Sequence, residues 1–139
     1  MTNFHASKQI SAPLSKVWAI MSNIDNDPVY WHGTKSINNI RRSENTVERE
    51  VVIAFKNSVC REIVTLDPKK SVKKKITDGA MKGTKDIIIT AIADNKTRVD
   101  VQWDIKVKGF FGMFTWIIKK HISEGSEDAL ERISKAAQR

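Results

Sequence analysis

Three basic residues occupy strand-like segments on the same side as apolar neighbours. By alternation, Arg49 shares a strand face with Val47, Val51, Ile53 and Phe55. Arg61 shares one with Val59 and Ile63, and Lys74 shares one with Val72 and Ile76. Alternate residues of a strand point to the same face of the sheet, so these cations would point in the same direction as their apolar neighbours. A buried guanidinium or ammonium is costly unless it is paired. The pattern therefore predicts an anion clamp for a ligand carboxylate or phosphate, formed by Arg49, Arg61 and Lys74.

The alternative is that these cations are neutralised within the protein or turned away from the interior. Glu48, Glu50 and Glu62 are near enough in sequence to pair with them, and a bulge or register change would turn a cation outward. Asp25 and Asp27 precede Pro28 and are interpreted as helix caps rather than as paired acids.

Signatures of metal, phosphate or nucleophilic chemistry are missing from the sequence. His5, His32 and His121 have no partner at metal-ligand spacing, and the single cysteine, Cys60, has none either. The segment from Gly79 to Lys85 lacks the spacing of a phosphate-binding loop. We therefore predict no metal, no cofactor and no catalytic residue. If the protein is an enzyme after all, the candidate acids and bases are Tyr30, His32 and Arg61.

Bulk composition describes an ordinary globular chain with a basic surface. The 139 residues are 40% hydrophobic and 29% charged, with a formal net charge of +8. One domain covering residues 1–139 is expected. The polar start and single cysteine favour a cytoplasmic protein, and we expect no transmembrane segment. The positive charge either attracts an anionic surface, lipid or nucleic acid, or only keeps the protein soluble.

Aromatic residues bracketed by lysines stand out before the C-terminal segment. Residues 110–118 read Phe-Phe-Gly-Met-Phe-Thr-Trp-Ile-Ile, with lysines on both sides. This arrangement suits a segment that touches anionic headgroups. The alternative is that these residues belong to the core. The candidates for membrane contact lie off the apolar stripe of the segment: Phe110, Met113, Trp116 and Ile117.

The elements that must position these residues can be located from periodicity and turn signals. A strand is expected at 4–11 and a helix at 13–22. A second short helix is expected within 25–31, after a carboxylate cap that precedes Pro28. Strands are expected at 34–42, 46–55, 58–67, 71–77, 84–93 and 97–108. Pro13 fits the first helical position, and Gly109 ends the last strand. The short connections make successive strands antiparallel neighbours.

A long C-terminal helix is expected at about 111–137. Its apolar stripe runs through residues 111, 114, 118, 122, 125, 129, 133 and 136, which recur at spacings of three and four. Gly125 interrupts the stripe and costs a helix about 1 kcal/mol relative to alanine. It therefore indicates either a close approach or space for another group.

Four short motifs occur along the chain in a fixed order: Ile10-Ser-Ala-Pro-x-x-x-Val-Trp18, Tyr30-Trp31, Gly79-x-x-x-Gly83-Thr and Gly109 before the long helix. These motifs and the order of elements resemble the START, polyketide cyclase/dehydrase and birch-pollen-allergen superfamily, also called SRPBCC. The resemblance covers nearly the whole chain. It implies an α+β helix-grip fold, in which a curved antiparallel sheet of about seven strands wraps a long C-terminal helix, with two short helices after the first strand.

The resemblance also implies a cavity for a hydrophobic or amphipathic small molecule, such as a lipid, a quinone or a polyketide-like compound, with the protein acting as a carrier or sensor. The alternatives are a cyclase or dehydratase that uses the same cavity, and a basic interaction module for RNA, ribosome or a protein partner. Aromatic residues and methionines make an adaptable apolar wall. The residues expected to line the cavity are Trp18, Met21, Tyr30, Trp31, Phe55, Met81, Trp103, Phe114, Ile118 and Ile122.

Overall fold

A seven-stranded antiparallel sheet and a long helix form the two layers of the protein. The computed structural model describes residues 2–107 and 115–139. The strands are β1 (Thr2–Ile10), β2 (Thr34–Arg42), β3 (Thr46–Ile53), β4 (Val59–Asp67), β5 (Ser71–Gly79), β6 (Met81–Ala93) and β7 (Lys96–Val107). Their order in the sheet is β1-β7-β6-β5-β4-β3-β2. Strands β2 to β7 therefore form a meander, and β1 pairs with β7 at its edge rather than with β2.

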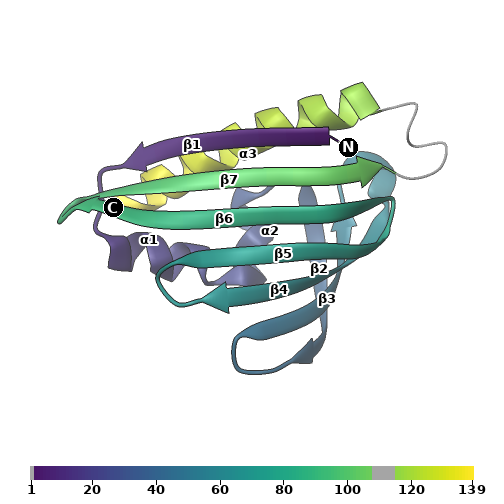
Figure 1. The fold of residues 1–139 in the computed structure, drawn as a ribbon, viewed down its shortest axis with the longest axis horizontal. Helices are drawn as coiled ribbons and strands as arrows, with labels where there is room; N and C mark the ends of the chain where they lie inside the picture. The colour runs from purple at the N-terminus through teal and green to yellow at the C-terminus, as the bar shows by residue number, and fades with distance from the viewer. Residues whose placement is uncertain (1, 108–114) are drawn as a thin grey trace.

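Helices cover one face of this curved sheet (Figure 1). They are α1 (Leu14–Met21), the 3₁₀ turn η1 (Ile24–Asn26), α2 (Asp27–Tyr30) and α3 (Thr115–Ala137), with a second 3₁₀ turn, η2 (Phe55–Asn57), between β3 and β4. The long helix α3 runs beside β1 and β7, and α1 and α2 lie against its C-terminal half. The predicted α+β helix-grip fold is confirmed.

Strand β7 shows why the sequence forms a two-layer structure. Val99, Val101 and Ile105 are each at most 1% exposed, and the residues between them are partly exposed. Burying a branched side chain of this size stabilises the fold by about 1.5–3 kcal/mol. The alternation therefore fixes which face of the sheet meets the helices.

The entry into α1 differs slightly from expectation. Pro13 is the residue before the helix, with an extended ψ of 154°, rather than its first helical residue. The backbone oxygen of Pro13 still accepts the first bonds of the helix, from the amides of Lys16 and Val17. The following Val17 is fully buried, so the junction anchors α1 in the core.

The described residues form two apolar clusters in the interior, and Trp103 packs against both. The larger cluster lies where α1 and the C-terminal half of α3 meet β1, β6 and β7, and includes Ile10, Val17 and Ile133. The smaller cluster lies nearer the start of α3 and includes Cys60, Met81 and Ile118. The space between the sheet and the first half of α3 is not filled by side chains, and the candidate site lies there.

Candidate functional site

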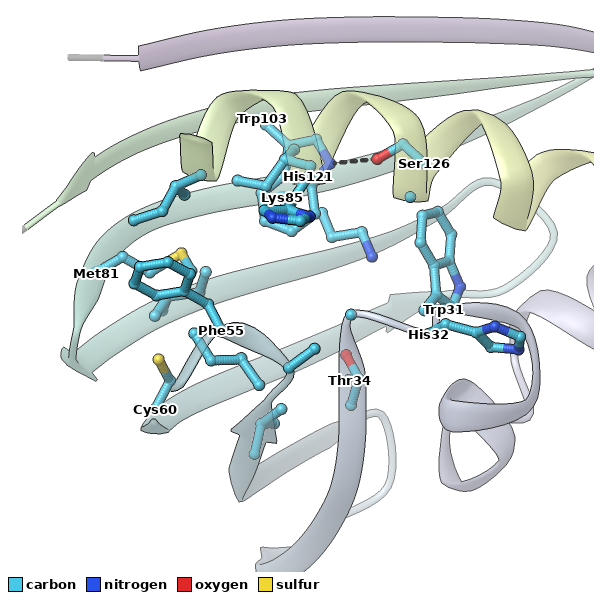
Figure 2. A pocket seen from close by; sticks show the side chains of 18 of the residues that line it. Trp31, His32, Thr34, Phe55, Cys60, Met81, Lys85, Trp103, His121 and Ser126 are labelled. Carbon is cyan, nitrogen blue, oxygen red and sulfur yellow. Dashed lines mark hydrogen bonds between the residues drawn. The ribbon is translucent and has the colours of Figure 1, made fainter. Parts of the chain in front are cut away.

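A cavity of about 440 Å³ separates α3 from the concave face of the sheet. Its walls come from β3 to β7, from the first half of α3 and from the segment 31–34 that leads into β2 (Figure 2). Volumes of this size are typical of small-molecule sites. The apolar lining residues are Trp31, Val51, Ile53, Ala54, Phe55, Cys60, Ile76, Met81, Trp103, Ile118 and Ile122.

Gly125 lies in the cavity wall and explains the interruption of the apolar stripe on α3. A Cβ atom added there would meet no atom outside the helix's own neighbouring backbone within 4 Å. The glycine is therefore not needed for close packing. It leaves open space beside the cavity, the second of the two reasons that the sequence suggested.

Six of the ten residues expected at the cavity do line it: Trp31, Phe55, Met81, Trp103, Ile118 and Ile122. Trp18, Met21 and Tyr30 do not, because they pack into the larger apolar cluster at the C-terminal half of α3. The tenth, Phe114, lies outside the described residues. Phe55 reaches the cavity from η2 rather than from a strand. Whether any of these residues contacts a ligand stays a prediction.

A buried ionic network borders the cavity. Arg49 is 1% exposed and donates to the carboxylate of Glu62 at 2.9 Å, to the carboxylate of Asp27 at 2.6 Å and to the backbone oxygen of Ile24 at 2.9 Å. Lys74 donates to the same oxygen of Asp27 at 2.7 Å. Burial alone would raise the pKa of Asp27, but the charges of Lys74 and Arg49 lower it below its ordinary value.

This network changes the interpretation of the predicted anion clamp. Arg49 and Lys74 do point inward, but Asp27 and Glu62 already pair with them. Arg61 does not face the cavity: its side chain is 47% exposed and lies 3.8 Å from Glu50 and 4.0 Å from Glu48. Strand β4 carries apolar residues on both faces, and the inward set is Cys60, Glu62 and Val64 rather than the set that contains Arg61.

The helix-cap interpretation of Asp25 and Asp27 is wrong. No side-chain capping bond is present at η1 or α2. Asp25 instead pairs with Arg42 at 2.9 Å on the surface, and Asp27 enters the buried network. Two carboxylates only two residues apart therefore have opposite environments, because one lies on the exposed side of the turn and the other on the buried side.

Lys85 is the main residue of the site that the sequence reasoning missed. It extends from β6 into the cavity, is 4% exposed, and places its Nζ 3.2 Å from the ring centre of Trp31 and 4.9 Å from that of Trp103 (Figure 2). Trp103 is held in place by a bond from its Nε1 to the hydroxyl of Ser126 at 3.1 Å. Lys85 alternates with Ile87 and Ile89 on β6, so the pattern that identified Lys74 as inward-facing could also have identified Lys85.

Several polar groups lie at the edge of the cavity. His32 lines the cavity and its Nε2 lies 3.1 Å from the backbone oxygen of Val29, whereas Tyr30 and Arg61 are not among the lining residues. His121, Glu124 and Asp128 of α3 also line it. Among residues 2–107 and 115–139 no cluster of histidine, cysteine and acidic side chains could hold a metal ion.

The segment proposed for membrane contact is only partly described. Phe110 and Met113 lie outside the described residues, Trp116 is 71% exposed, and Ile117 is half-buried. None of the helices in the described part of the chain has the length and apolar character needed to span a bilayer.

A curved sheet that grips a long helix over an apolar cavity defines the class of helix-grip proteins. Within that class, residues 1–138 match the family described as polyketide cyclase / dehydrase and lipid transport, and the chain belongs to this family. No curated protein sequence matches the chain.

Solved structures with the same fold include protein TTHA0849 of Thermus thermophilus and the Zhui aromatase/cyclase of a Streptomyces species. Both superpose with a TM-score of 0.81 over 99% of this chain, at 15% and 11% identity, and cover 97% and 94% of their own chains. A START superfamily protein of Mycobacterium smegmatis superposes with a TM-score of 0.70 at 15% identity, over 94% of this chain and 98% of its own. At such identities the likeness concerns the fold.

Proposed function

We propose that the protein binds a hydrophobic or amphipathic small molecule in the cavity and acts as its carrier or sensor in the cytoplasm. The observation that carries the proposal is the unfilled space of about 440 Å³ beside Gly125, lined by indole, phenyl, thioether and branched side chains. Burial of apolar ligand surface would supply about 25 cal/mol per Å². The family description, which includes lipid transport, supports the same proposal.

The test is a fluorescence titration with N-phenyl-1-naphthylamine, a neutral apolar probe, on the wild type and two variants. Gly125→Leu would place a branched side chain in the open space and should weaken probe binding at least tenfold. Glu127→Leu adds the same side chain at an exposed position of α3 and should bind as the wild type does. Absence of binding by the wild type, or equal binding by both variants, would contradict the proposal.

An enzymatic use of the same cavity is the second candidate function. The family description and the aromatase/cyclase among the structural neighbours favour it. A cyclase or dehydratase needs a group that transfers protons within the cavity, and of the candidates from sequence only His32 lines it. The His32→Gln variant separates the two functions: probe binding should persist in either case, and loss of turnover of a polyketide-like substrate would support the enzyme.

Peripheral contact with an anionic membrane would let a carrier load and release its ligand. Trp116 at the start of α3 is 71% exposed, and Lys119 and Lys120 follow it on exposed positions. Such an arrangement suits the headgroup region. In vesicle flotation, Trp116→Ser should reduce binding to anionic vesicles, whereas Ile92→Ser, at an exposed apolar site near the β6–β7 turn, should not. Wild-type protein that ignores such vesicles but is retained on RNA at low salt would favour the nucleic-acid alternative instead.

A further inference from the structure

The side chain of Lys85 is only 4% exposed and lines the cavity, where its amine has no polar partner among the described residues. Within the described part of the chain its Nζ makes neither a hydrogen bond nor an ion pair, and its contacts are the faces of Trp31 and Trp103. Buried ammonium groups are almost always paired. The position of Lys85 therefore requires an explanation that packing alone does not give, since a methionine would fill the same space without a polar atom.

Burial and the charges around Lys85 determine the pKa of its amine. The network contains two carboxylates: Asp27 accepts hydrogen bonds from Arg49 and Lys74, and Glu62 accepts one from Arg49. Lys74 lies directly opposite Lys85 on the neighbouring strand β5, so a third positive charge would face a like charge. Burial, and then the charge of Lys74, lower the pKa of Lys85 well below its ordinary value, against smaller opposing effects of Asp27 and Glu62.

A lysine in an apolar pocket beside another cation is the arrangement that makes an amine nucleophilic. We propose that Lys85 forms an imine with an aldehyde or ketone that the cavity holds. The inference rests on the proposed function, because the carbonyl compound must first bind in the cavity. It adds a class of ligand, hydrophobic carbonyl compounds, and a covalent step.

The step balances without an oxidant or reductant. The lone pair of Nζ attacks the carbonyl carbon, and the carbonyl oxygen takes up a proton as nitrogen loses one, which gives a carbinolamine. The C–O bond then breaks, the oxygen leaves with a second proton from nitrogen as water, and a C=N bond forms.

The geometry also selects the shape of the carbonyl compound. Trp103 is held by its hydrogen bond to Ser126, and the amine lies 3.2 Å from the ring centre of Trp31 and 4.9 Å from that of Trp103. A flat, conjugated carbonyl compound could stack on an indole while its carbon reaches Nζ. Cinnamaldehyde meets these requirements and serves as the probe.

The test traps the imine by reduction. The protein is incubated at pH 7 with a small excess of cinnamaldehyde and sodium cyanoborohydride, and the adduct is located by peptide mass spectrometry. Of the 17 lysines, Lys85 should be modified at least tenfold faster than the average of the others. The rate at Lys85 should level off at a lower pH than the rates of the surface lysines.

Two variants and a second probe keep the test decisive. Lys85→Met should lose the fast adduct, and Lys82→Arg, at an exposed position of the same strand, should keep it. Adducts spread over surface lysines, with Lys85 unmodified, would overturn the imine. If wild type and Lys85→Met then still bind N-phenyl-1-naphthylamine, the imine fails and the carrier function stands. If neither binds the naphthylamine probe, the proposed function fails as well.

Discussion

Removal of the Asp27 charge tests the central structural claim, that a buried ionic network borders the cavity. In Asp27→Asn the side chain keeps its shape but no longer neutralises Lys74, for which Asp27 is the carboxylate partner among the described residues, and Arg49 loses one of its two. Breaking a buried pair by removing one partner costs about 3–5 kcal/mol, because an uncompensated charge stays behind. For a domain of this size that corresponds to a fall in Tm of roughly 10–20 °C.

The assay is urea unfolding followed by circular dichroism at pH 7, with Asp25→Asn as the matched control. Asp25 also pairs with an arginine, Arg42, but both side chains are more than half exposed, so its loss should cost less than about 1 kcal/mol. Two carboxylates two residues apart are thus expected to differ several-fold in their contribution to the free energy of unfolding.

The pH dependence gives a second readout of the same variant. The pKa of Asp27 lies below 3.8, its ordinary value, in the folded protein. Its stabilising effect is therefore fully present above that value and is lost as the pH falls through the lower, folded-state pKa. The difference between wild type and Asp27→Asn should stay constant from pH 7 to about pH 5 and shrink below about pH 4. A loss of less than about 1 kcal/mol at pH 7, or a difference that does not shrink in acid, would refute the reasoning.

Further measurements address single positions. Gly125→Ala should raise the free energy of unfolding by about 1 kcal/mol, since it removes a helix-interior glycine without any collision. Gly83→Ala should lower it by about 1–3 kcal/mol, because φ is +143° there and a Cβ would collide with the carbonyl oxygen of Asp104. A urea midpoint equal to that of the wild type would contradict the prediction for that variant. Burial raises the pKa of the Cys60 thiol, so iodoacetamide at pH 8 should alkylate it slowly in the native protein and at the rate of a free peptide in urea. Lys85→Met should stabilise the protein more at pH 6 than at pH 10. The pKa of Lys85 is lowered in the folded state, so the free-energy cost of its charged amine is present at low pH and disappears as the pH approaches the pKa of lysine in the unfolded chain. A stabilisation that does not depend on pH would contradict this.

The fold was predictable because its signals are local and repeated. The alternation in β7 identified the buried face correctly, and turn residues such as those at 67–68 and 94–95 placed the connections of the meander. Strand ends moved by a few residues, as in β6, which begins at Met81 rather than at residue 84. Such differences arise because strand ends depend on pairing with neighbours, which the pattern of one segment does not contain.

The site was only partly predictable, because partners far apart in sequence decide the role of each polar residue. The inward positions of Arg49 and Lys74 followed from the alternation of side chains along their strands. Their pairing with Asp27 required knowing that the start of α2 lies against β3 and β5. Arg61 was misplaced because β4 has apolar residues on both faces, Val59 being 52% exposed and Val64 fully buried. The alternation of side chains along a strand does not say which of two such faces is buried.

Lys85 and Lys74 show that two lysines on neighbouring strands can have very different partners. Both point inward from paired positions of β5 and β6, and both are at most 4% exposed. Lys74 donates to the carboxylate of Asp27, whereas the amine of Lys85 has only the indole faces of Trp31 and Trp103 as partners among the described residues. A carboxylate placed beside Lys85 should therefore pair with its amine and lower its reactivity. Ile76→Glu, at a cavity-lining position of β5 that was apolar, offers such a partner; it should slow the trapping of cinnamaldehyde at Lys85 if the unpaired amine is what reacts, and an unchanged rate in a folded variant would contradict that explanation.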